Sequence, residues 1–195
     1  MDLGFTANLE KIVNVILFLA KEVQPLYKTK LIKLLYLADE QSVKDIGVPI
    51  TWLKYKVWKK GPVPKSLFEE ISFYEGRKLS PAITLIKDDQ SIRIANNQDP
   101  DLTVFSEYEI DTLNRTIANF GNLSGKELIE ICHSGESLWF KAVKEHNLEQ
   151  HWEMDMEIST SPFNIDFKDL LIDQPLKSHL FDSVKENIEF STTLS

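Results

Sequence analysis

The apolar residues in the first quarter of the chain recur at helical spacing in two long runs. The run from 9 to 23 carries an aliphatic residue every three or four positions, and Pro25 ends it. The second run continues to about residue 44, with Thr29 as the expected N-cap and Gly47 as the stop signal. Because this second run is apolar on nearly every side, we predict that its helix is central and buried.

The pattern is less regular from residue 52 to 60. Trp52, Tyr55 and Trp58 lie three apart, as on a helical turn. The alternation of Tyr55 with Val57 instead fits one face of a strand. We favour helix or irregular structure for this segment.

Turn residues divide the next part of the chain. Gly-Pro-Val-Pro at 61–64 is a break, and Pro64 precedes a helix expected over 65–74. Two runs rich in isoleucine then flank the polar residues Asp88, Asp89 and Gln90, which predicts one β-hairpin.

Serine and glutamate mark the start of two further helices. Ser106 precedes Glu109 by three positions, and Ser124 precedes Glu127 in the same way, which is the pattern of a capping box. Together with the apolar spacing that follows, these signals predict helices over 107–120, from 125 to about 132, and from 137 to about 146.

The organisation changes after about residue 148. Up to that point there are 20 acidic and 19 basic residues, whereas the remainder has 10 acidic and 3 basic ones. The remainder has helical spacing only over 167–172 and 176–190. We therefore predict a mainly α fold: a compact helical domain with one small β-hairpin over 1–148, followed by a partly helical acidic extension over 149–195.

Composition indicates the cellular compartment in which we expect the protein. Hydrophobic residues make up 43% and charged residues 27%, as in ordinary soluble proteins. The longest apolar run, 12–20, is too short to span a bilayer, and the first residues lack the basic start of a secretory signal. The single cysteine, Cys132, excludes an intramolecular disulfide. We expect a cytoplasmic protein that does not enter the membrane.

The sequence contains no glycine-rich phosphate loop, no H-E-x-x-H motif and no closely spaced cysteines, so we expect no cofactor, no metal and no catalytic residue. Cys132, His133 and Glu136 could suggest a hydrolase, but neighbouring helical residues point about 100° apart. A buried Cys132, with His133 and Glu136 anchoring the next helix, is favoured. His146 and His151 are favoured as surface residues over metal ligands.

One segment combines basic and aromatic residues. Lysines alternate there with large rings, in the order Trp52, Lys54, Tyr55, Lys56, Trp58, Lys59, Lys60 and Lys65. Three interpretations stay open: core packing of the rings, a protein-binding surface, or single-stranded nucleic acid binding. The near-neutral first part and the acidic second part argue against nucleic acid binding.

Five motifs occur in the order found in one known family. The residues from Lys30 to Asp39 resemble the K-L-x-K-L-L-Y-[FL]-[AS] opening of the Panacea domain of SocA-like antitoxins, which also occurs in phage-associated proteins. Further matches are Gly47–Thr51 to G-x-P-[IL]-[TS], Trp58–Val63 to W-x-x-G-P-V, Ser106–Glu109 to [ST]-x-x-E, and Leu128–Trp139 to the closing H-x-E-x-[PL]-W segment.

The resemblance implies an antitoxin that is not an enzyme. It would neutralise a toxin encoded beside it, either by direct binding or by delivering the toxin to a ClpXP-type protease. The alternative function is a nucleic-acid-binding regulator of a phage or mobile element. We expect these motif residues to maintain the fold: Lys30, Leu34, Tyr36, Trp58, Gly61, Pro62, His133, Glu136 and Trp139. The expected partner surface is the exposed part of 54–65, together with the acidic tail.

Overall fold

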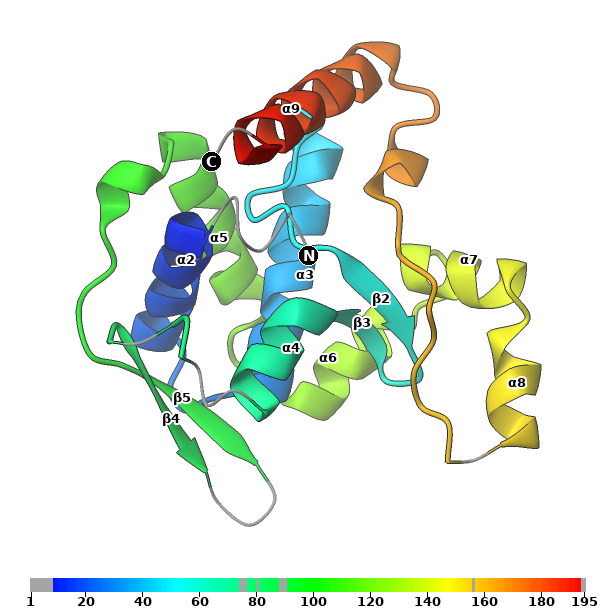
Figure 1. Ribbon diagram of the computed structural model, residues 1–195, viewed down its shortest axis with the longest axis horizontal. Helices are drawn as coiled ribbons and strands as arrows, with labels where there is room; N and C mark the ends of the chain where they lie inside the picture. Colours follow the sequence, from blue (N-terminus) through cyan, green and yellow to red (C-terminus); the bar gives the residue numbers. More distant parts are fainter. Residues whose placement is uncertain (1–8, 74–76, 80, 88–90, 156, 194–195) are drawn as a thin grey trace.

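The computed structural model describes residues 9–73, 77–79, 81–87, 91–155 and 157–193. Its centre is helix α3 (Lys28–Ile46), in which every residue from 31 to 39 is buried. Figure 1 shows α2 (Leu9–Glu22) and α5 (Glu107–Phe120) on one side of α3. The predicted central helix is therefore confirmed.

The start of α3 corrects one expectation. Tyr27 occupies the N-cap position and makes no side-chain capping hydrogen bond, so Thr29 lies inside the helix and is not its cap. The predicted end is confirmed, because Gly47 takes the left-handed conformation (φ 88°) and its N–H donates to the carbonyl of Val43.

The two capping boxes are confirmed. In α5 the Ser106 side chain accepts from the N–H of Glu109, and the Glu109 carboxylate accepts from the N–H of Ser106. Ser124 and Glu127 make the same pair of bonds at the start of α6 (Gly125–Cys132). The other elements of this half are a short 3₁₀ turn η1 (Leu102–Val104), α7 (Leu138–Glu145) and α8 (Leu148–Met154).

The predicted hairpin is confirmed as β4 (Ile83–Lys87) and β5 (Ile92–Asn96), and its turn, 88–90, lies outside the described residues. β1 (Leu26–Tyr27) adds a third antiparallel strand beside β5. The helix expected over 65–74 is α4 (Lys65–Ser72), and residue 74 also lies outside the described residues.

The prediction for residues 52–60 is wrong, because part of this segment is strand. β2 (Tyr55–Trp58) pairs with β3 (Gly61–Pro64) as a second antiparallel hairpin. Residues 159–165 run along the other edge of β2. There the Val57 N–H donates to the carbonyl of Phe163 (3.0 Å), and the Ile165 N–H donates to the carbonyl of Tyr55 (2.8 Å). The segment 61–64, predicted as a break because of its glycine and two prolines, is the partner strand β3, so the break signal concealed a local hairpin.

The hydrophobic core continues past residue 148 into the segment predicted as an extension. Buried residues of the C-terminal part are Trp152, Ile165, Phe167, Leu171 and Phe181. Trp152 is in α8, and Ile165 lies in the segment that follows it. Phe167 is in the 3₁₀ turn η2 (Phe167–Leu170), Leu171 comes directly after that turn, and Phe181 is in α9 (Pro175–Thr193).

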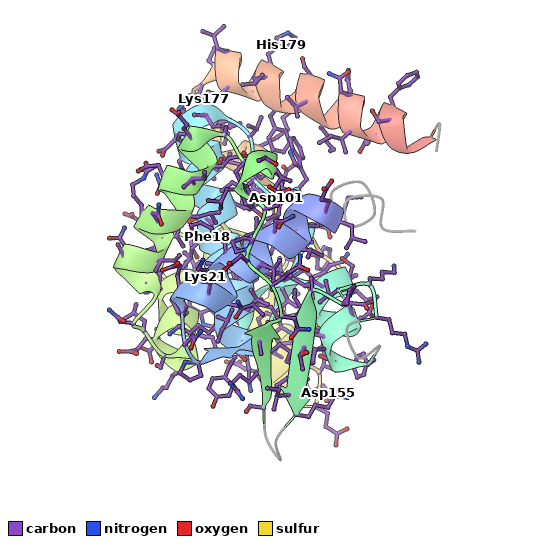
Figure 2. All side chains as sticks on the ribbon, turned by 90° about the vertical axis from the view of Figure 1, so that its left-hand side faces the viewer. Phe18, Lys21, Asp101, Asp155, Lys177 and His179 are labelled. Carbon is purple, nitrogen blue, oxygen red and sulfur yellow. The ribbon has the colours of Figure 1, made fainter. Side chains whose placement is uncertain are left out.

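Helix α9 lies across the end of the molecule where α3 finishes. In Figure 2 it crosses the top of the view, with exposed His179 pointing away from the body. The Lys177 ammonium donates to the carbonyl of Lys44 (2.6 Å), which attaches α9 to the last turn of α3. Within the described residues, no helix combines the length and apolar character needed to cross a membrane.

Candidate functional site

The turn of the β2–β3 hairpin is held against α3 by a buried lysine. The Lys33 ammonium, with only 2% of the residue exposed, donates to the carbonyl of Pro62 (2.8 Å). Gly61 has a φ of 92°, and a Cβ on it would lie 2.8 Å from Lys33 Nζ and 3.4 Å from His133 Nε2. Glycine is required here by both the backbone and the lack of space. We call Lys33, Gly61, Pro62, His133 and Trp139 the motif junction.

The second half of the motif junction is an aromatic stack. The rings of His133 and Trp139 lie 3.7 Å apart and nearly parallel (7°), and Trp139 Nε1 donates to the carbonyl of Trp58 (2.8 Å). His133 therefore packs on Trp139 and does not anchor the next helix through Glu136. Glu136 is exposed, and Ser137 caps α7.

Burial shifts the pKa values of the ionisable groups in and beside the motif junction. It lowers the pKa of Lys33 to about 8 and, with the neighbouring Lys33 charge, the pKa of His133 to about 4. Burial also raises the pKa of the Cys132 thiol to about 12, against the opposing effect of Lys33. At neutral pH the junction holds a cationic lysine and a neutral imidazole, beside a neutral thiol. A neutral thiol is a poor nucleophile.

A second buried polar cluster joins α3 to the approach of β2. Oδ1 of Asp39, which is fully buried, accepts from the Thr51 N–H (2.8 Å), and Oδ2 accepts from the hydroxyls of Thr51 and of Tyr55 (2.8 Å from the tyrosine). Burial raises the pKa of Asp39 to about 6, and these hydrogen bonds oppose that shift. Tyr36 packs edge-on against Tyr55 (5.3 Å). Tyr55 is 1% exposed, so it is a core residue and not part of a partner surface.

Leu34 and Lys30 are two predicted motif residues of α3 that differ in burial. Leu34 is fully buried, whereas Lys30 is half-buried and has its pKa lowered by burial, with Glu127 acting against that shift. Sequence reasoning did not single out Lys33 and Asp39 as individual residues, although both lie within the quoted motif. The signal that could have found them is a charged residue within an otherwise apolar helical run.

Trp52 is covered by the C-terminal helix. Its ring lies 5.0 Å from that of Phe181 in α9, and both rings line a cavity of about 230 Å³. Phe167 from η2 and Lys54 complete part of the wall. Trp52 is therefore half-buried beneath a segment of its own chain.

The predicted lysines mostly reach the surface on or next to the β2–β3 hairpin. The exposed ones are Lys54, Lys59, Lys60 and Lys65. Lys65 pairs with Glu69 (3.6 Å) on the first turns of α4. Lys56 is half-buried and donates to the carbonyl of Pro162 (2.6 Å), so it helps to fix the segment beside β2. Lys59 and Lys60 form the turn between the two strands.

An aromatic row begins at Trp58 and crosses α4. Trp58 meets Phe68 edge-on (4.9 Å), and Phe68 meets Phe73 edge-on (6.2 Å). The Lys28 ammonium lies 4.4 Å from the centre of the Phe68 ring. Sequence reasoning missed both phenylalanines, because nothing in the local spacing shows that Phe73 is 68% exposed. We call Trp58, Phe68 and Phe73 the aromatic ladder.

The two histidines weighed as metal ligands lie apart from this ladder. His146 stacks on Phe163 (3.7 Å, 9°), and His151 is exposed on α8. Among the described residues, no group of three or more histidine, cysteine, aspartate or glutamate side chains is arranged to hold a metal ion.

Comparison with known proteins places these features in a family. The model of the Panacea domain of SocA-like antitoxins matches residues 31–140, which is more than half of the chain. The chain belongs to the SocA-like antitoxin family. The matched region includes nearly all of α3, both hairpins and α4 to α6, and it ends within α7. The residues of the motif junction therefore all lie inside the Panacea domain.

The similarity to known proteins does not extend beyond this domain. No curated protein and no solved structure matches the chain. The aromatic ladder lies inside the Panacea domain, whereas η2 and α9 lie outside it.

Proposed function

We propose that this protein is a cytoplasmic antitoxin that neutralises one partner toxin by direct binding, and that it is not an enzyme. The observation that carries the proposal is the position of the motif residues. The family is described as SocA-like antitoxins. Lys33 of α3 and Trp139 of α7 hold the β2–β3 hairpin through backbone carbonyls, and the lysines of its turn stay exposed.

A well-anchored hairpin with an exposed turn suits protein recognition. Lys33 ties its turn to α3, Trp139 ties the carbonyl of Trp58, and residues 159–165 tie the outer edge of β2. A surface fixed in this way loses little conformational entropy when a partner binds.

The alternative of a cysteine hydrolase has little physical support. Cys132 is 1% exposed, and burial raises the pKa of its thiol to about 12. The imidazole of His133 is stacked on Trp139. We expect Cys132→Ser to leave toxin neutralisation unchanged.

The test is a growth assay by co-expression. The open reading frame beside this gene is induced alone and then together with this protein. Rescue of a growth arrest and co-purification of the two chains support the proposal. A harmful neighbour that is not rescued, or a harmless one, contradicts it.

Two modes of neutralisation make different predictions. Direct occlusion leaves the toxin at its normal level, whereas delivery to a ClpXP-type protease lowers the toxin level and fails in a strain without the protease. We propose occlusion, because the exposed turn of the hairpin, Lys59 and Lys60, offers a surface for direct contact with the toxin. Immunoblotting of the toxin in both strains separates the two modes.

The same exposed lysines favour one second candidate, a nucleic-acid-binding regulator. Lysines next to Trp58 resemble the combination used to bind single strands. A net charge of −8 opposes it. Binding to DNA from its own promoter, with affinity that falls steeply as salt rises, would support this candidate.

A further inference from the structure

Phe73 is large, apolar and mostly exposed, yet it continues an ordered row of rings. It is 68% exposed at the C-terminal end of α4, and its ring contacts Phe68, which contacts the half-buried Trp58. Isolated exposed apolar residues are common, but an exposed ring that extends a packed aromatic row is typical of an interaction site.

Four lysines lie close to this row in contact or in sequence, and one of them, Lys65, is paired with Glu69 (3.6 Å). The ammonium of Lys28 donates to the hydroxyl of Ser72 (3.0 Å) and lies over the Phe68 ring. Lys59 and Lys60 follow Trp58 directly at the hairpin turn, and Lys65 begins α4. The rings suit an apolar anchor, and the lysine charges complement an acidic segment.

The inner part of the ladder is packed before any partner arrives. The Trp58 carbonyl accepts from Trp139, and Phe68 lies between Trp58, Phe73 and the ammonium of Lys28. Rigid aromatic anchors lose few rotamers on binding, so they give much affinity for each contact.

The C-terminal helix of the same chain does not cover this face. Lys28 is the first residue of α3, whereas α9 is attached at Lys44 and Gly47, at the other end of that helix. The 19 residues of α3 span roughly 28 Å. Figure 1 likewise shows α9 at the end of α3 away from α4.

We infer that the aromatic ladder, with Lys28, Lys59, Lys60 and Lys65, is the docking surface for an acidic segment of the partner protein that carries an apolar anchor residue. The anchor packs beside Phe73, and its flanking carboxylates pair first with the turn lysines Lys59 and Lys60. This inference rests on the proposed function and specifies which face of the hairpin meets the toxin.

Two matched pairs of variants test it. Phe73→Ala is compared with Phe190→Ala, because Phe190 is 67% exposed but lies on α9 directly after the acidic Glu189. Lys59→Glu/Lys60→Glu is compared with Lys126→Glu/Lys185→Glu, which reverses two exposed lysines on α6 and α9. The full-length protein is used in every case, and circular dichroism verifies that each variant is folded.

The binding probe is a short fluorescein-labelled peptide rich in Asp and Glu with two leucines, measured by anisotropy. A peptide with Lys in place of each acid, and a short duplex DNA, are measured beside it. We expect the acidic peptide to bind best, and each ladder variant to lose about tenfold or more in affinity. The α9 and α6 controls keep the affinity of the unmodified protein. Equal binding by ladder variants and controls, or preference for DNA, overturns the inference.

Growth rescue by the same variants separates this inference from the proposed function. If the unmodified protein and the ladder variants all rescue growth from the neighbouring toxin, the antitoxin function stands and the docking surface is wrong. If the unmodified protein binds the acidic peptide through the ladder but rescues nothing, the surface stands and the antitoxin function is wrong.

Discussion

The β2–β3 hairpin has two sides of opposite character. Its inner side meets the motif junction, where Lys33, Gly61 and Pro62 are buried and in close contact. Its outer side presents Lys59 and Lys60 to solvent beside the aromatic ladder. Residues that hold the fold are thus separated in space from residues available to a partner, although both sets occur within the same short motif.

The largest effect is expected at the inner side, from Trp139→Ala. Trp139 is 6% exposed, stacks on His133 and donates to the carbonyl of Trp58, so its removal leaves a cavity and takes one hydrogen bond from that carbonyl. We expect the free energy of unfolding to fall by about 4 kcal/mol. Urea denaturation measures it. An unchanged midpoint, together with lost partner binding, would show that Trp139 is part of the partner interface. The distinction between the two sides of the hairpin would then be wrong.

Gly61→Ala should have the next largest effect. The alanine would have to adopt a φ of 92°, and its Cβ would lie 2.8 Å from Lys33 Nζ. We expect a loss of about 1–2 kcal/mol in the free energy of unfolding. Gly135→Ala is the control, because a Cβ there meets nothing within 4 Å and its φ is not positive. Equal stability of the two variants would show that the turn does not need glycine.

The third largest effect is expected at the inner side, from the titration of His133. The pKa of His133 is lowered by burial to about 4 from an unfolded value near 6.5, so the folded state prefers the neutral ring. This contribution to stability is complete above pH 6.5 and is lost as the pH falls toward 4. His133→Phe keeps a ring on Trp139 and cannot titrate.

The measurement is the difference in unfolding free energy between the unmodified protein and His133→Phe as a function of pH. The raised pKa of Asp39 acts in the opposite direction, but it is common to both proteins and cancels. Relative to the variant, the unmodified protein should lose about 1 kcal/mol by pH 5, half of the full linkage value because the ring is only half-buried. Parallel curves would mean that the ring is not desolvated.

Local signals were enough to predict most of the helices. The apolar spacing of α3 and the two capping boxes depend on residues within a few positions of one another, so they can be read directly from the sequence. β2 could not be predicted in this way. Its partner β3 is close in sequence, but the prolines at 62 and 64 indicate a break, and the contact on its other edge, from the Ser161 hydroxyl to the Val57 carbonyl, spans 104 positions.

The site was predictable to a similar extent. The family motifs identified Gly61, His133 and Trp139, but not the fact that a Cβ at Gly61 would meet both Lys33 and His133. The exposure of Phe73 also depends on what packs around α4, which a sequence does not state. Contacts between motifs were therefore found only in three dimensions.

The smallest effect on stability is expected at the outer side, from Lys59→Glu/Lys60→Glu. Both side chains are exposed, and the hydrogen bond from Lys59 to Ser159 uses the backbone N–H, which the substitution keeps. We expect the free energy of unfolding to change by less than about 0.5 kcal/mol. Urea denaturation of this variant beside Lys126→Glu/Lys185→Glu measures the change. A loss above about 1 kcal/mol would mean that the turn lysines help to hold the hairpin, because reversing their charge would then disturb the strand pairing itself. A near-zero change leaves the turn lysines available to a partner, since the motif junction and residues 159–165 would then account for the stability of the hairpin.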